Sequence, residues 1–422
     1  MTDIAKKSRN PFTAFLCKVM LISAFMNTAL RSGPEASLTA FRILAVLTIP
    51  FLLLRFFRLF VKEVFLLIGL LILALLQYSA FAITSLHELT VSYLHIIFIF
   101  AVYICVKILS KLEAENFSEN MYRFLDRFTV FTIILTLIEY IFSISIFPAT
   151  QVRSCPTAFF WNENELCCAL FLMLPLYFMS WKQEKSIFTA AKMLAIIYFI
   201  YAFDCKILML STLLMFFLYI VLMNEKMLKN YQLLLLISLI VIGAAIILFC
   251  YIDFSIPSGN DYDVKPTFGT AVREPVMQIL RLERFYSAGS IHDRSDAIII
   301  GLQNLVNTHG IGIGLGGSLH ILDGELATAK SMHNITVQTI VEIGVIALIV
   351  YLIFIFKLYC TVTKIAWFKL CFFLILPLSS SISSVGIMSN YMFWGIVFFV
   401  FSMQIPHWEN IKTEPQQVKL EN

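Results

Sequence analysis

Charged side chains are scarce in this sequence. Asp, Glu, Lys and Arg make up 14% of its 422 residues, whereas hydrophobic residues make up 59% and the mean hydropathy is +0.85. Soluble proteins use about a quarter of their residues as charged groups. The composition therefore excludes an ordinary soluble domain and predicts a protein whose outer surface faces lipid.

Motifs for metal or nucleic-acid binding are also missing. The nine cysteines form no C-x-x-C pair and, together with the histidines, no spacing typical of a metal site. Most of the cysteines lie in apolar runs, where this residue behaves as a small buried hydrophobic group. Lysines and arginines flank the apolar runs and do not cluster with aromatic residues. We therefore expect no metal, no cofactor and no nucleic-acid partner.

Long apolar runs are what the sequence has in quantity. Each approaches the roughly 20 residues that a helix needs to cross the hydrocarbon core of a bilayer. The predicted spans are 12–30, 38–54, 64–81, 89–106, 128–147, 164–181, 187–203, 207–223, 231–252, 335–356, 366–383 and 390–404. The predicted fold is therefore an all-α polytopic membrane protein with about twelve transmembrane helices.

Basic residues orient these spans, because cytoplasmic loops are enriched in Lys and Arg. Every second connection is basic: the N-terminus, Arg55/Arg58/Lys62, Lys107/Lys111/Arg123/Arg127, Lys182/Lys185, Lys226/Lys229, Lys357/Lys364/Lys369 and the tail with Lys412 and Lys419. The alternate short connections hold only Arg31, Arg153 and Lys206. Both termini are thus predicted to be cytoplasmic, with residues 253–334 forming one large periplasmic loop.

This topology divides the chain into three parts: spans one to nine in 1–252, the loop in 253–334, and spans ten to twelve with a cytoplasmic tail in 335–422. Cys155 and Cys205 both fall on its outer, oxidising side. A disulfide between them is conceivable there, but the sequence leaves it open because it does not show that the two cysteines lie close together.

The outer loop has features of a functional region. It contains four of the seven histidines in less than a fifth of the chain, and histidine is needed for neither topology nor solubility. Residues 293–308 have apolar residues at helical spacing, which predicts an amphipathic helix that lies on the membrane or caps the bundle. The glycine-rich run 309–317 fits either a tight chain path or a backbone N–H nest for phosphate.

A polar stripe begins where the loop re-enters the membrane. Asn334, Gln338 and Glu342 recur every four residues and therefore share one face of the predicted helix. Glu342 should face the protein interior, because a carboxylate in lipid costs on the order of 3 kcal/mol. His333 stands at the water interface, where its imidazole could accept a proton from an arriving group. The structural alternatives are an interfacial histidine, a helix cap at Asn334 and a packing network around Glu342.

Three cations fall on the predicted outer face, where short connections normally lack them. Arg153 precedes the sixth span, Lys206 lies between the seventh and eighth, and Arg294 begins the amphipathic helix. Lysine and arginine bind phosphate groups, so together these residues could hold an anionic lipid head group such as a diphosphate. Ordinary solvated charge is the alternative for each residue taken singly.

Three segments carry a resemblance to a known family. RSCPTAFFWNENELCCALFLMLP has an arginine followed by Asn-x-Asn before a helix. RSDAIIIGLQNLVNTHGIGIGLG has an arginine, an amphipathic helix and a glycine-rich turn, and HNITVQTIVEIGVIALIVYL, the most specific of the three, begins a re-entry helix with His-Asn. With about twelve spans, cytoplasmic termini and one late periplasmic loop, the chain resembles the bacterial O-antigen polymerase and O-antigen ligase superfamily.

The resemblance implies an inverting, metal-independent glycosyltransferase. It would polymerise undecaprenyl-diphosphate-linked oligosaccharide repeat units at the periplasmic face of the bacterial inner membrane. His333 would accept the proton of the acceptor hydroxyl. The residues implied to bind the diphosphate are Arg153, Lys206 and Arg294, and those implied to support the site are Asn334, Gln338 and Glu342. The family often has arginine where Lys206 stands.

Two other functions stay open. An O-antigen ligase shares these features but transfers the finished glycan to lipid A-core. A transporter or flippase for a lipid-linked glycan should place its polar residues near the bilayer midplane. In this sequence they gather at the predicted outer face, which favours an enzyme. The implied partners are the undecaprenyl-diphosphate-linked glycan, membrane lipid, and chain-length regulator and flippase proteins.

Overall fold

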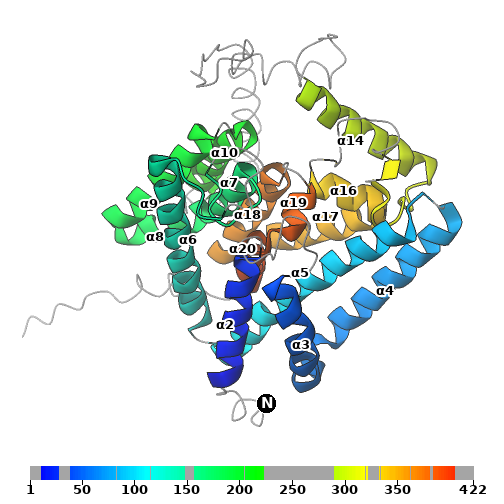
Figure 1. Ribbon diagram of the computed structural model, residues 1–422, viewed down its shortest axis with the longest axis horizontal. Coiled ribbons are helices and arrows are strands. Elements are labelled where there is room, and N and C mark those ends of the chain that lie inside the picture. The colour runs from blue at the N-terminus through cyan, green and yellow to red at the C-terminus, as the bar shows by residue number, and fades with distance from the viewer. Residues whose placement is uncertain are drawn as a thin grey trace, which may run out of the picture.

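Every element in the described part of the chain is a helix in the computed structural model (Figure 1). The described residues are 11–27, 39–81, 83–114, 116–147, 156–203, 205–222, 289–318, 320–321, 332, 334–361, 363–380 and 384–403. The predicted span 231–252 and much of the predicted loop lie outside them. The all-helical content of the described residues agrees with the predicted all-α fold.

Most of the helices overlap the predicted spans. In chain order the helices are α2 (Pro11–Phe25), α3 (Ala40–Arg55), α4 (Phe57–Phe81), α5 (Leu86–Leu112), α6 (Phe117–Phe142), α7 (Glu163–Phe171), α8 (Leu174–Glu184), α9 (Ile187–Ala202), α10 (Lys206–Leu222), α14 (Gly289–Asn307), α16 (Ile335–Ile343), α17 (Val345–Tyr359), α18 (Lys364–Ser379), α19 (Ser384–Ser389) and α20 (Tyr391–Ser402). Helices α14 and α19 lie outside the predicted spans. Each predicted span within the described residues overlaps one or two helices.

Two predicted spans are each divided into two helices. The span 164–181 becomes α7 and α8, because Pro175 at the start of α8 lacks the N–H that would continue the hydrogen-bond ladder of α7. The span 335–356 becomes α16 and α17, which meet at Gly344 with φ 97° and ψ −176°. Neither break was predicted, because both segments are apolar enough to be taken as single spans.

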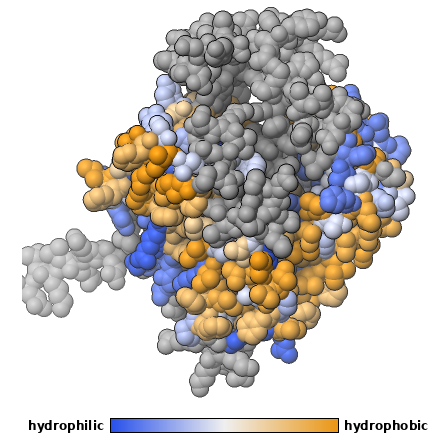
Figure 2. Space-filling model, viewed as in Figure 1, coloured by the Kyte–Doolittle hydropathy of each residue, from blue (hydrophilic) through white to orange (hydrophobic). Residues whose placement is uncertain are grey.

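The outer surface has membrane character. Three segments are long and apolar enough to cross a membrane, Phe57–Phe81, Leu86–Leu112 and Glu163–Trp181. Large apolar side chains also project outward on other helices, and Figure 2 shows hydrophobic residues over much of the visible surface that is coloured. A contiguous apolar surface of this extent is rare on soluble monomers. The fold therefore indicates a helical membrane protein.

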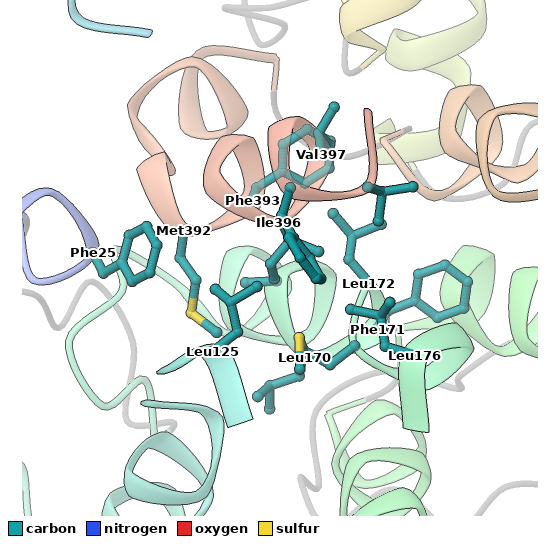
Figure 3. Close-up of a cluster of buried hydrophobic side chains, with 14 of the residues drawn as sticks. Phe25, Leu125, Leu170, Phe171, Leu172, Leu176, Met392, Phe393, Ile396 and Val397 are labelled. Atoms are coloured by element: carbon teal, nitrogen blue, oxygen red, sulfur yellow. The ribbon is translucent and has the colours of Figure 1, made fainter. Parts of the chain in front are cut away.

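The largest hydrophobic core includes side chains of α2, α6, α7, α8 and α20 (Figure 3). Phe25 of α2, Leu170 of α7 and Met392 of α20 belong to it. Helix α20 approaches α2 closely because residue 395 is glycine: a Cβ on Gly395 would lie 2.6 Å from the Phe25 ring. Since α20 also packs against α5, this core connects to the part of the molecule that holds α4, α14 and α16.

Ion pairs join neighbouring helices. Lys107 of α5 bonds to Glu63 of α4, and the Tyr103 hydroxyl donates to the same carboxylate oxygen over 3.1 Å. Lys192 of α9 lies 2.5 Å from Asp126 of α6. Pairing offsets the cost of holding charge among apolar helices, so these contacts can tie α4 to α5 and α6 to α9.

Candidate functional site

Helix α16 begins with a side-chain cap at Asn334. The Asn334 Oδ1 accepts hydrogen bonds from the backbone N–H groups of Thr336 and Val337, over 3.0 and 3.1 Å. Such a cap satisfies N–H groups that have no partner within the helix. The sequence left more than one interpretation open for Asn334, and the structure shows the helix cap.

The polar stripe of α16 faces inward. Gln338 is 2% exposed and Glu342 is 1% exposed, one helical turn apart. This confirms the prediction that Glu342 turns away from lipid. The Gln338 Nε2 donates to Glu342 Oε1 over 2.9 Å, whereas the buried Gln338 Oε1 has no hydrogen-bond partner among the described residues. The stripe is thus a buried polar network with one open acceptor.

Glu342 is surrounded by hydrogen-bond donors. Besides Gln338, the hydroxyl of Ser318 donates to Glu342 Oε1. The backbone N–H groups of Gly316 and Ser318 lie near enough to interact electrostatically with the Glu342 carboxyl group. The hydrogen bonds to Glu342 therefore hold the chain near residue 318 against α16.

The glycine loop, defined here as residues 308–318, leads from α14 to the hydrogen bonds around Glu342. Four of its glycines have positive φ, between 79° and 96°: Gly310, Gly312, Gly314 and Gly316. Residues with a Cβ seldom adopt this region, so the alternating glycines allow a chain path that other residues would strain. The path turns the loop onto α16 and the ends of α4 and α5.

Hydrogen bonds join the glycine loop to the break between α16 and α17. The N–H of Ile313 donates to the Val341 carbonyl over 3.0 Å, and the N–H of Gly314 donates to the Glu342 carbonyl over 3.1 Å. Gln77 of α4 also donates to the Glu342 carbonyl, over 3.1 Å. Carbonyls at the end of a helix lack helical partners, and lipid cannot supply them. The glycine loop and Gln77 supply hydrogen-bond partners to these carbonyls instead.

Two glycines lie where backbone segments touch. A Cβ on Gly312 would lie 2.6 Å from the Glu342 carbonyl oxygen, and a Cβ on Gly344 would lie 2.3 Å from the Ile311 carbonyl oxygen. Both distances are well below a normal contact, and the atoms met belong to backbone. The glycine loop can therefore pack against the break between α16 and α17 only if both residues are glycine.

The glycine run thus forms a tight chain path, one of the two readings that its sequence left open. Its N–H groups at Ile313 and Gly314 bond to helix carbonyls, and that of Gly317 bonds to the Gly314 carbonyl over 3.1 Å. These donors are directed at the protein itself and not at a phosphate site.

Helix α14 matches the predicted amphipathic helix at 293–308 and packs against α16. Its buried residues include Ala297 and Leu305, with Gly301 between them. A Cβ on Gly301 would lie 2.2 Å from the methyl group of Met332, which precedes α16 by a few residues. The structure therefore brings the amphipathic helix, the glycine loop and the polar stripe together (Figure 1).

The remaining predicted site residues are only partly described. Arg153 and His333 lie outside the described residues. The backbone of Lys206 begins α10, and that of Arg294 lies in the first half of α14, but the side chains of both fall outside the description. Helix α10 packs against α18, α9 and α7, whereas α14 packs against α16. The two helices lie on different sides of the molecule in Figure 1.

The Asn-x-Asn segment stands at the start of α7, as its sequence predicts. Asn162 caps this helix, with its Oδ1 accepting from the Glu165 N–H over 2.9 Å. The Cys205 thiol donates to Asn164 Oδ1 over 3.2 Å. The possible Cys155 partner of Cys205 lies outside the described residues. The segment therefore anchors the start of α10 to α7.

Sequence reasoning missed the residues of α4, of α5 and of the connection between them that hold the glycine loop. The Gln77 Nε2 donates to the Ile311 carbonyl over 2.7 Å, and the Thr84 hydroxyl donates to the Leu315 carbonyl over 3.2 Å. A Cβ on Gly316 would lie 2.8 Å from the Glu88 carbonyl. One signal was available for Gln77: it is a lone amide in an otherwise apolar predicted span, where a polar side chain needs a partner.

Glu342→Ala should destabilise the protein strongly. The substitution leaves two buried donors, Gln338 Nε2 and the Ser318 hydroxyl, without their acceptor, and each unsatisfied buried donor costs about 1–3 kcal/mol. We expect the free energy of unfolding to fall by at least about 2 kcal/mol, measured by denaturant titration of the purified protein in detergent. Glu119→Ala is the control, because its pair with Arg123 is exposed and should matter by less than about 1 kcal/mol. Equal effects of the two substitutions on the free energy of unfolding would contradict a stabilising role for the hydrogen bonds to Glu342.

No protein-family model, curated protein or solved structure matches the chain. The class that the fold defines is a helical membrane protein. Its functional assignment therefore rests on the residues and on the geometry of α14, the glycine loop and α16.

Proposed function

We propose that this chain is a membrane glycosyltransferase that polymerises undecaprenyl-diphosphate-linked oligosaccharide repeat units. The observation that carries the proposal is the interlocking of α14, the glycine loop and α16. Helix α14 packs on α16, and the glycine loop is hydrogen-bonded to the last turn of α16. Two of the three segments that resemble O-antigen polymerases and ligases thus form one unit around Glu342. Their joint packing supports a shared role.

In the proposed reaction the acceptor hydroxyl attacks the anomeric carbon of the donor glycan. His333 takes the hydroxyl proton as the new glycosidic bond forms. The bond between the anomeric carbon and the diphosphate oxygen breaks, and undecaprenyl diphosphate leaves with the electron pair. Attack from the face opposite to the leaving group inverts the anomeric centre. The reaction needs no metal if side-chain cations stabilise the leaving group.

The proposed diphosphate-binding residues are Arg153, Lys206 and Arg294. Their positive charge would offset the charge that grows on the diphosphate as the glycosyl bond breaks. The geometry of α14 supports a role for Arg294. Arg294 belongs to α14, the helix that packs against α16.

Transfer by the purified protein tests the proposal. The chain, reconstituted in vesicles, would receive a synthetic undecaprenyl-diphosphate-linked repeat unit, and the products would be separated by size. A ladder of lengthening lipid-linked glycan identifies a polymerase. Product that forms only when lipid A-core is added identifies a ligase instead. No glycosidic bond with either acceptor would contradict both enzymatic readings.

A transporter of lipid-linked glycan is the second candidate, and the helix break favours it. Transporters often bind their substrates at discontinuous helices, and α16 and α17 are interrupted at Gly344 beside the buried Glu342. Movement of a fluorescent lipid-linked glycan across vesicles, without formation of a new bond, would identify this function. Transfer without such movement would exclude it.

The proposed topology has about twelve spans in a bacterial inner membrane, with both termini in the cytoplasm. We expect reporter fusions at positions 112 and 415 to be active as cytoplasmic reporters, and fusions within 260–330 to be active as periplasmic reporters, because basic connections stay inside. Paired alkaline phosphatase and fluorescent-protein fusions measure both states. A cytoplasmic result within 260–330 would place the proposed site on the wrong side for a lipid-linked donor in the outer leaflet.

A further inference from the structure

Helix α14 has more apolar surface than its contact with α16 covers. One side is buried and repeats every four residues: Ala297, Gly301 and Leu305. A second apolar side is exposed by 42%, 43% and 73% at Ile299, Leu302 and Val306. These three positions are spaced three and four residues apart and so form one continuous strip along the helix. No described element covers the strip.

Polar residues occupy a third side of the same helix. Successive residues of a helix are about 100° apart, so Gln303 and Asn307 lie beside the exposed apolar strip and away from the buried side. Both are exposed. The helix therefore has one side against protein, one exposed apolar side and one exposed polar side. This is the pattern of a helix at a boundary between lipid and water.

The exposed strip is continuous with the apolar surface of α17. After Val306 the chain turns through the glycine loop, where Ile311 is 49% exposed, and the Val345 N–H at the start of α17 donates to the Gly310 carbonyl over 2.9 Å. None of the residues Val345–Tyr359 of α17 is buried. Since α17 is an apolar helix whose outward side chains, such as Ile346 and Val350, are exposed, lipid is the environment that suits both surfaces.

We propose that α14 is a membrane-interface helix whose Ile299–Leu302–Val306 side inserts among the lipid acyl chains beside α17, while Gln303 and Asn307 face water. This resolves the two placements that the sequence left open: α14 both caps the bundle and lies on the membrane. The inference concerns lipid contact alone, so it does not depend on the proposed glycosyl transfer.

Photolabelling of the unaltered protein tests this placement. The full chain would be reconstituted in phosphatidylethanolamine and phosphatidylglycerol vesicles that contain a lipid with a diazirine on its acyl chain, and adducts would be mapped by mass spectrometry. We expect labelling of Ile299, Leu302 and Val306 within about threefold of that at Ile349 of α17, and at least about tenfold less labelling of Gln303 and Asn307. Labelling of α17 without α14 would overturn the proposal.

A second probe separates lipid from a protein partner. A photoreactive phenylalanine analogue at Val306 should form adducts with lipid, and the same analogue at Gln303 should form several-fold fewer. Both positions are exposed, so both variants should keep the elution profile of the parent protein in detergent. Cross-linking of Val306 to a second copy of the chain, in place of lipid, would overturn the proposal in favour of a protein interface.

Discussion

Gly344→Ala should prevent the glycine loop from seating against α16 and should destabilise the whole site. The backbone of Gly344, with φ 97° and ψ −176°, lies in a region that is essentially restricted to glycine. Strain there costs about 1–3 kcal/mol, and the new Cβ would also lie 2.3 Å from the Ile311 carbonyl oxygen. Because that atom is backbone, either the loop or the helix break must move. We expect the free energy of unfolding to fall by more than about 3 kcal/mol in total.

The measurement is thermal unfolding of the purified protein in detergent, with Gly69→Ala as the matched control. Gly69 lies inside α4, and nothing lies within 4 Å of a Cβ built on it. Alanine in a helix interior is favoured over glycine by about 1 kcal/mol, so this variant should unfold at the parent temperature or slightly above. An unchanged unfolding temperature in Gly344→Ala would show that the break tolerates a side chain and that the interlocking is loose.

His333→Ala should abolish detectable glycan transfer while leaving membrane insertion intact. A hydroxyl is a poor nucleophile at neutral pH, so the proposed reaction needs a base beside it. Histidine titrates in the required range without special tuning. Loss of a general base typically lowers the rate by about 10²- to 10⁴-fold. The measurement is the rate of transfer from a purified lipid-linked donor, with protein level determined in the same vesicles.

His320→Ala is the most informative control among the loop histidines. His320 Nδ1 lies 3.7 Å from Glu88 Oε2, and the side chain is 58% exposed, so the substitution removes a surface contact near the glycine loop. Transfer by this variant should stay within about tenfold of the parent rate. His309→Ala and His292→Ala should also be mild. If His333→Ala turns over at the parent rate, the base lies elsewhere and Glu342 becomes the next candidate.

Local sequence patterns predicted the helices and the orientation of the polar stripe. Apolar runs long enough to cross a bilayer must satisfy their backbone groups internally, so they form helices whatever their neighbours are. The four-residue spacing of Asn334, Gln338 and Glu342 put them on one face, and the cost of exposing a carboxylate to lipid turned that face inward. These features depend on residues within a few turns of one another.

The sequence by itself thus determined the helical class, the membrane character and an inward Glu342. Only the tertiary structure decided what Glu342 bonds to, why the glycines alternate, and where the span 335–356 breaks. Gln77 reaches the carbonyls of Ile311 and Glu342 across 234 and 265 residues of sequence. Local spacing contains no information about such contacts, because they exist only once α4, the glycine loop and α16 are packed together.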